Sequence, residues 1–203
     1  MRVVHALRLK GFADTRALVA AAGVLDERAI VDALDAAKRE GWVTRREGAL
    51  NGWALTPAGR ARDRQAIDAE LALTGVRAVI EDAYRRFVAL NRELLQVCTD
   101  WQLKEDDPAV LNDHADAAYD VAVIGRLRAV DGAVQPVCAD LGHALERFAP
   151  YGPRLHKALR HVEQGDHDWF AKPVIDSYHT VWFELHEDLL VTLGLERSKE
   201  GTR

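Results

Sequence analysis

Residues 40–60 read EGWVTRREGALNGWALTPAGR, and this stretch decides the fold of the first third of the chain. Two short runs typical of β-strands, 42–46 and 53–55, flank a polar segment that ends in Asn51-Gly52. Asn-Gly favours the positive φ angles of a tight hairpin turn. Thr56 and Pro57 then form a favoured pair of helix cap and first helical residue. The stretch therefore predicts a β-hairpin that is followed at once by a helix.

Three helical patterns precede this hairpin, and glycines follow the first and the third. The second helix can be capped by Asp14 or by Thr15, whose side-chain oxygens accept from free N–H groups of a first turn. A turn at Gly23-Val24 leads to the third helix, which Asp26 caps. The apolar residues expected to be buried at helical spacing are Val3, Val4, Leu7, Leu18, Val19, Ala22, Ile30, Leu34 and Ala37.

Three helices followed by a hairpin is the order of a winged helix. The quoted stretch resembles the "E-G-[L/W]-V-x-R … L-T-x-x-G-R" segment of MarR/PadR-like winged-helix transcriptional regulators, and the resemblance covers about residues 1–65. It implies that the third helix enters the major groove of DNA while the hairpin, or wing, reaches the backbone or minor groove. Carried over by position, the DNA-binding residues would be Thr15, Arg16, Arg28, Asp32, Arg45, Arg46 and Asn51.

The third helix is acidic for an element that reads DNA, because Asp26, Glu27, Asp32 and Asp35 accompany Arg28. A carboxylate can accept a hydrogen bond from cytosine. Most of the affinity for DNA nevertheless comes from neutralised phosphates. The alternative function is therefore a winged-helix module that binds another protein and not DNA.

The net charge of −5 conceals two parts of opposite sign. Residues 1–66 contain 12 Lys and Arg against 8 Asp and Glu, whereas residues 67–203 contain 15 against 24. We interpret the two parts as domains, 1–66 and 67–203. The basic first domain is the candidate for a polyanionic partner, here double-stranded DNA.

The second part is expected to be all-α, so the fold class is mainly α with one small hairpin. Apolar residues at three- to four-residue steps predict a long helix over 77–103. Shorter helices are expected at about 110–129, 135–148 and 153–164, with a break at Asp131-Gly132. A last helix begins near Pro173 and ends at Gly194.

The long helix would span about 40 Å, which is more than a domain of this size requires. Its apolar stripe includes Tyr84, Phe87, Leu94 and Trp101, and aromatic residues are enriched in the cores of interfaces. We therefore expect a homodimer whose seam lies on this stripe. In the competing interpretation the four following helices cover the stripe within one chain.

The last helix supplies candidates for a ligand site. Tyr178, Trp182 and His186 lie within nine positions, and apolar walls with a few polar tips are usual in ligand pockets. The domain could therefore sense an unidentified small-molecule effector. The alternative is that the three side chains form the core.

The sequence contains none of the short motifs that would indicate an enzyme class. No H-E-x-x-H, G-x-S-x-G, Walker A or G-x-G-x-x-G motif is present, and Cys98 and Cys138 are expected to be small buried hydrophobic residues. We expect no cofactor and no metal site, so a helical metal sensor or enzyme is the least favoured hypothesis. Without an apolar run of about 18 residues or a secretory signal, a cytoplasmic protein is expected.

Overall fold

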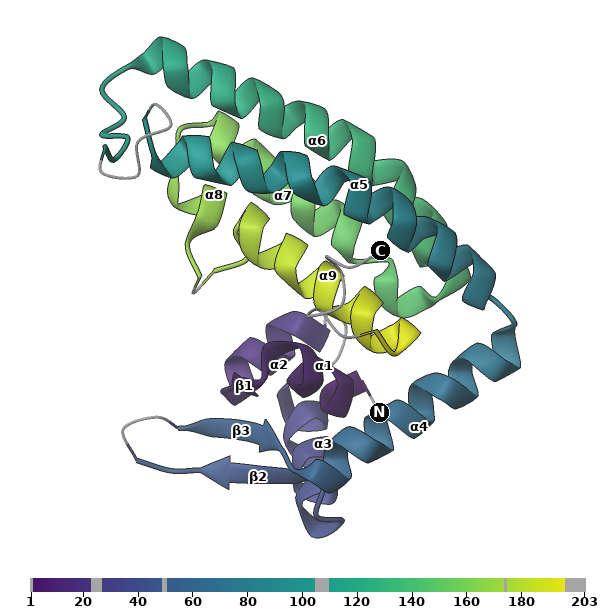
Figure 1. Ribbon diagram of the computed structural model, residues 1–203. Helices are drawn as coiled ribbons and strands as arrows, with labels where there is room; N and C mark the ends of the chain where they lie inside the picture. Colours follow the sequence, from purple (N-terminus) through teal and green to yellow (C-terminus); the bar gives the residue numbers. More distant parts are fainter. Residues whose placement is uncertain (1, 23–26, 49–50, 105–109, 174, 196–203) are drawn as a thin grey trace. The chain divides into compact units, whose positions relative to one another are not determined.

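The computed structural model describes residues 2–22, 27–48, 51–104, 110–173 and 175–195. The described chain is mainly helical and has a small three-stranded antiparallel sheet (Figure 1). It divides into two compact units, one of residues 1–75 with 190–203 and one of residues 76–189. Among the described residues, none of the helices combines the length and the hydropathy that a membrane span requires.

The first unit contains the predicted helices and hairpin. In chain order its elements are α1 (Arg2–Lys10), β1 (Phe12–Ala13), α2 (Thr15–Ala22), α3 (Glu27–Arg39), β2 (Val43–Arg46), β3 (Gly52–Leu55) and α4 (Pro57–Thr74).

The core of the first unit is the apolar stripe that the sequence predicts. Leu7, Leu18, Ile30 and Leu34 are fully buried in it, and Val19 is partly buried against it. Asp14 caps α2, because its carboxylate accepts from the N–H of Ala17 at 2.7 Å. The expected turn at Gly23-Val24 and the expected cap Asp26 lie outside the described residues, as does the side chain of Ala22.

The sheet has the strand order β1-β3-β2, and both pairings are antiparallel. The hairpin β2–β3 is therefore confirmed, while the two-residue strand β1 was not predicted. The expected positive φ at Asn51-Gly52 is wrong, because Gly52 is already the first residue of β3. In the described part of the hairpin the positive φ falls at Gly48 (122°), since this connection is longer than a two-residue turn.

Helix α4 begins as predicted, because the hydroxyl of Thr56 accepts from the N–H of Gly59 at 3.0 Å. It continues past the expected domain boundary at residues 66 and 67, since Ala66, Ile67 and Leu71 are all buried. The helix ends only at Gly75, which has the left-handed φ of 68° that favours glycine. The division into units follows this helix end.

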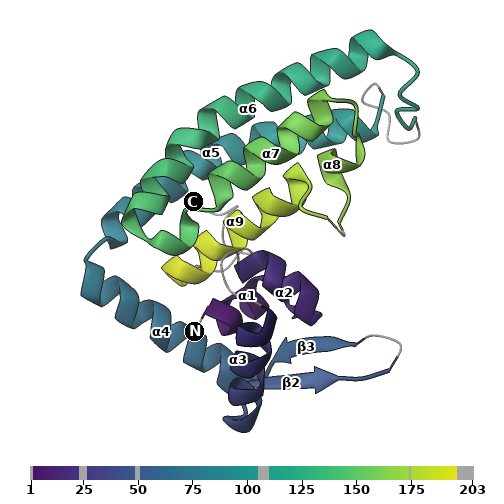
Figure 2. The same ribbon diagram turned by 180° about the vertical axis from the view of Figure 1, so that it is seen from behind.

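The regular elements of the second unit's described part are helices, apart from one isolated β-bridge between Leu103 and Leu111. Its elements are α5 (Arg77–Gln102), α6 (Ala117–Ala144), the 3₁₀ turn η1 (Glu146–Phe148), α7 (Tyr151–Glu163), α8 (Asp168–Ala171) and α9 (Tyr178–Leu193), of which the last turn from Leu190 belongs to the first unit. Helices α5 and α6 lie side by side along most of their length (Figure 2).

The predicted break at Asp131-Gly132 is wrong. Helix α6 runs through both residues and through Pro136. Glycine costs a helix about 1 kcal/mol and an interior proline about 3 kcal/mol relative to alanine. Burial of one face outweighs this cost, since Val130, Val134 and Val137 are each at most 3% exposed.

The stripe on α5 is covered within the chain. Phe87 and Leu94 are at most 1% exposed, and the Phe87 ring stacks on Trp182 of α9 with centroids 4.5 Å apart. These side chains cannot form a dimer seam, so the seam predicted on this stripe is wrong. Periodicity identifies the apolar face of a helix but not the element that covers it.

Candidate nucleic-acid interface

Helix α3 presents a charged face opposite its buried one. Arg28, Asp32 and Asp35 are exposed and follow one another at three- or four-residue steps, which places them on one side of the helix. Arg39 continues this stripe one further turn along and is exposed as well. Val31 lies beside the stripe with 37% of its surface exposed, so an apolar contact is available next to the charges.

The charges of α3 are balanced. Glu27, Asp32 and Asp35 are the three acidic residues of the helix, and Arg28, Lys38 and Arg39 are the three basic ones. The two cations in the last turn were not among the predicted site residues, although Arg39 lies eleven positions after Arg28 and hence on its face. The helix is therefore less repulsive to phosphates than its first half suggests.

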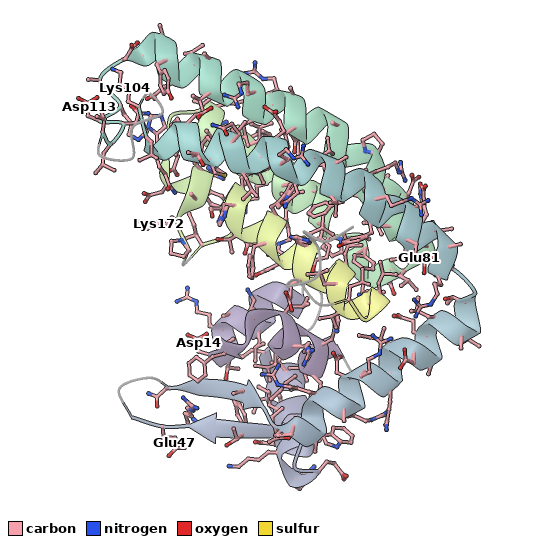
Figure 3. All side chains as sticks on the ribbon, viewed as in Figure 1. Asp14, Glu47, Glu81, Lys104, Asp113 and Lys172 are labelled. Carbon is pink, nitrogen blue, oxygen red and sulfur yellow. The ribbon has the colours of Figure 1, made fainter. Side chains whose placement is uncertain are left out.

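The hairpin carries its two arginines on the exposed side. Arg45 and Arg46 of β2 are both exposed, and Arg45 pairs with Trp53 across the sheet. The Arg45 guanidinium lies over the Trp53 ring, 5.5 Å from its centroid, and its Nε is 3.5 Å from the carboxylate of Glu47. Glu47 follows β2 at the end of the hairpin where the chain leads on to β3 (Figure 3). A stacked guanidinium keeps its outer N–H groups available to an anion.

Trp53 joins the hairpin to the start of α2. Its ring is only 4% exposed, and its Nε1–H donates to the hydroxyl of Thr15 at 3.3 Å. Thr15 is the first residue of α2 and is followed by the exposed Arg16. One buried tryptophan therefore contacts both Arg45 and the first residue of α2, a helix whose N-terminus is capped by the carboxylate of Asp14.

Asn51 has a structural role in the hairpin. Its side-chain oxygen accepts from the N–H of Gly48 at 3.0 Å, which holds the two described ends of the connection together. Its amide nitrogen is exposed with the rest of the residue. Of the predicted DNA-binding residues, the structure brings Thr15 and Arg45 together through Trp53. Arg28 and Asp32 lie on the exposed face of α3.

The predicted ligand residues of the second unit are core residues. Tyr178, Trp182 and His186 are each at most 4% exposed. The Tyr178 hydroxyl donates to Asp131 at 3.3 Å, and Trp182 Nε1–H donates to the side-chain oxygen of Asn91 at 2.9 Å. Because these polar tips are engaged within the unit, the structure gives the three residues packing roles, and ligand binding by them stays a prediction.

Compared with protein-family models, with curated proteins and with solved structures, the chain finds no match.

Proposed function

We propose that the first unit is a winged helix-turn-helix that binds duplex DNA, and that the chain is a transcriptional regulator. The observation that carries the proposal is the position of Trp53. Its ring supports Arg45 on the hairpin, and its indole N–H holds Thr15 at the start of α2. A wing that offers cations is a typical means of binding the DNA backbone.

In this proposal the residues divide into two roles. Arg16, Arg45 and Arg46 contact phosphates, which positions the protein without reading sequence. The α3 stripe enters the major groove, where Arg28 or Arg39 donates to guanine and Asp32 accepts from cytosine. Val31 offers an apolar contact to a thymine methyl group.

The regulator is proposed to act as a homodimer, because two symmetric half-sites one turn of DNA apart double the contact area of a single unit. The dimer seam lies outside the buried face of α5, since that face is covered in one chain.

A protein-interaction module is the second candidate function. The acidic pair Asp32 and Asp35 in the centre of the exposed α3 stripe favours it, because carboxylates there repel phosphates and suit a basic protein surface.

The test is selection of fragments from the protein's own genome by the purified full chain, followed by binding measurements on the selected fragment. Arg45→Ala/Arg46→Ala should weaken binding to all duplexes alike, because phosphates carry no sequence information. Arg28→Ala should relax the preference at one base pair by about 1–3 kcal/mol. Arg85→Ala/Arg92→Ala, which removes two exposed arginines from α5, is the matched control for the hairpin variant and should bind as the wild type does.

Selection of no fragment at low salt would overturn the DNA-binding proposal and leave the interaction module. Equal loss of binding in Arg85→Ala/Arg92→Ala and in the hairpin variant would also contradict it, because the effect would then follow net charge and not the hairpin.

A further inference from the structure

Three side chains with metal-binding atoms meet at one end of the second unit. His114 lies in the segment before α6, Asp120 in the first turns of α6, and His167 directly before α8. One ring nitrogen of each histidine and one carboxylate oxygen of Asp120 all lie within 4.8 Å of one another. Figure 3 marks this end of the unit by its labels for Lys104 and Asp113.

The distances suit a common ion. The Nδ1 atom of His114 is 3.0 Å and 3.2 Å from the two carboxylate oxygens of Asp120. Two ligand atoms at about 2.0–2.2 Å from one ion are separated by about 3.3–3.6 Å in tetrahedral geometry. The separation within the His114–Asp120 pair is close to that of two ligands of one ion, and a ring nitrogen of His167 lies within 4.8 Å of both.

Asn112 fixes the Asp120 carboxylate and the backbone of His114 by hydrogen bonds. It is 8% exposed, and its amide nitrogen donates to Asp120 Oδ1 at 2.9 Å and to the backbone oxygen of Trp101 at 3.2 Å. Its side-chain oxygen accepts from the backbone N–H of His114 at 3.1 Å. Partners of this kind orient the ligands of metal sites.

Trp101 orients both imidazoles. Its ring centroid is 4.4 Å from that of His114 and 5.0 Å from that of His167, and its other contact is a parallel stack with Phe170 at 4.3 Å. A hydrogen bond between His114 and Asp120 does not by itself explain why His167 lies beside them. Convergence of His167 on the same point, against the same tryptophan, is what distinguishes a binding site from an ordinary pair.

We propose that His114, Asp120 and His167 bind a divalent first-row transition-metal ion, with Zn²⁺ as its representative. Two imidazoles and one carboxylate form a nitrogen- and oxygen-donor set that suits such ions better than Mg²⁺ or Ca²⁺, which prefer oxygen ligands alone. Three protein ligands leave at least one coordination position for water or a small ligand. The side chain of His114 is 34% exposed and His167 is exposed, so an ion can enter from solvent.

This proposal departs from the expectation of no metal, and it does not rest on DNA binding. The sequence gives no sign of such a site, because the three residues come from separate segments and His167 is 47 positions from Asp120. Neither the spacing of histidines on a helix nor a short motif indicates such a set.

The test is calorimetric titration of the full chain, prepared without a histidine tag and stripped with a chelator, with Zn²⁺ and separately with Mg²⁺. We expect one Zn²⁺ per chain and no heat of binding for Mg²⁺. His114→Gln and His167→Gln should each weaken Zn²⁺ binding at least about tenfold. His143→Gln removes an exposed histidine from α6, outside the cluster, and should leave the affinity unchanged.

His167→Gln keeps the hydrogen bond between His114 and Asp120, so it separates loss of a ligand from loss of the loop structure. Circular dichroism of each variant checks that the helices remain. In the Co²⁺-loaded wild type, ligand-field absorption should report four or five ligands, and His167→Gln should change it. The proposed site would be overturned if the wild type did not bind Zn²⁺. It would also be overturned if His114→Gln and His167→Gln both bound Zn²⁺ as tightly as the wild type.

Discussion

Cys98 on α5 and Cys138 on α6 are both buried free thiols, as the sequence predicts. Burial raises the pKa of each thiol to about 12. At pH 8 the reactive thiolate is then on the order of one molecule in ten thousand, because each pH unit below the pKa lowers it tenfold. We expect the native chain to resist a disulfide exchange reagent at pH 8, and both thiols to react at once in denaturant. Rapid labelling of the native chain would contradict their burial.

His179 on α9 makes stability depend on pH. Burial lowers its pKa from the ordinary value of 6.5. As pH falls through about 6.5 the unfolded chain takes up a proton that the folded chain resists, so the free energy of unfolding falls until pH is below the folded pKa.

We therefore expect His179→Gln to lose less stability than the wild type between about pH 7 and about pH 5 in urea unfolding. The exposed His143 provides the control, since His143→Gln should keep the wild-type dependence. If His179→Gln and the wild type lost equal stability, His179 would not be the group responsible.

Among the elements, the helices of the first unit could be predicted closely because their signals are local. Caps such as Thr56, and glycines such as Gly41 with its φ of 73°, act within a few residues of the helix end. The continuity of α6 could not be predicted, since Gly132 and Pro136 both oppose a helix locally. Burial of its valines, which depends on the packing of the whole unit, decides the outcome.

Two glycines in helices should respond in opposite ways to alanine. A Cβ atom on Gly59 of α4 would stand 2.0 Å from the backbone oxygen of Trp42, whereas one on Gly132 of α6 would meet nothing within 4 Å. Gly59→Ala should lower the free energy of unfolding by about 1–3 kcal/mol or more. Gly132→Ala should raise it by about 0.4–1 kcal/mol. Chemical denaturation measures both, and a neutral Gly59→Ala would refute the close contact of α4 with Trp42.

Neighbouring leucines on α5 test which face of that helix is covered. Leu94 is 1% exposed and Leu95 is 53% exposed. Leu94→Ala should cost about 2–5 kcal/mol of stability, and Leu95→Ala should stay within about 0.5 kcal/mol. Neither substitution should change the molecular mass that sedimentation measures, because Leu94 is buried within one chain. A variant at Leu94 that separates a dimer while the chain keeps its stability would restore the seam that the structure excludes.

For the whole molecule, the candidate sites differ in how far the sequence indicates them. The exposure of Arg45 and Arg46 could be expected from the predicted hairpin and from the resemblance of this stretch to winged-helix regulators. The contact of Trp53 with Thr15 could not, because it joins residues 38 positions apart. The metal cluster and the coverage of the α5 stripe likewise depend on tertiary contacts, which periodicity and motifs do not contain.

DNA binding by the first unit is the central claim, and its salt dependence tests it most directly. The affinity of the full chain for a duplex from its own genome should fall with salt by a slope that corresponds to about three or four phosphates per protomer. Arg45→Ala/Arg46→Ala should reduce that number by about two, because each arginine neutralises one phosphate. Absence of binding at low salt, or an identical slope in this variant, would contradict the account.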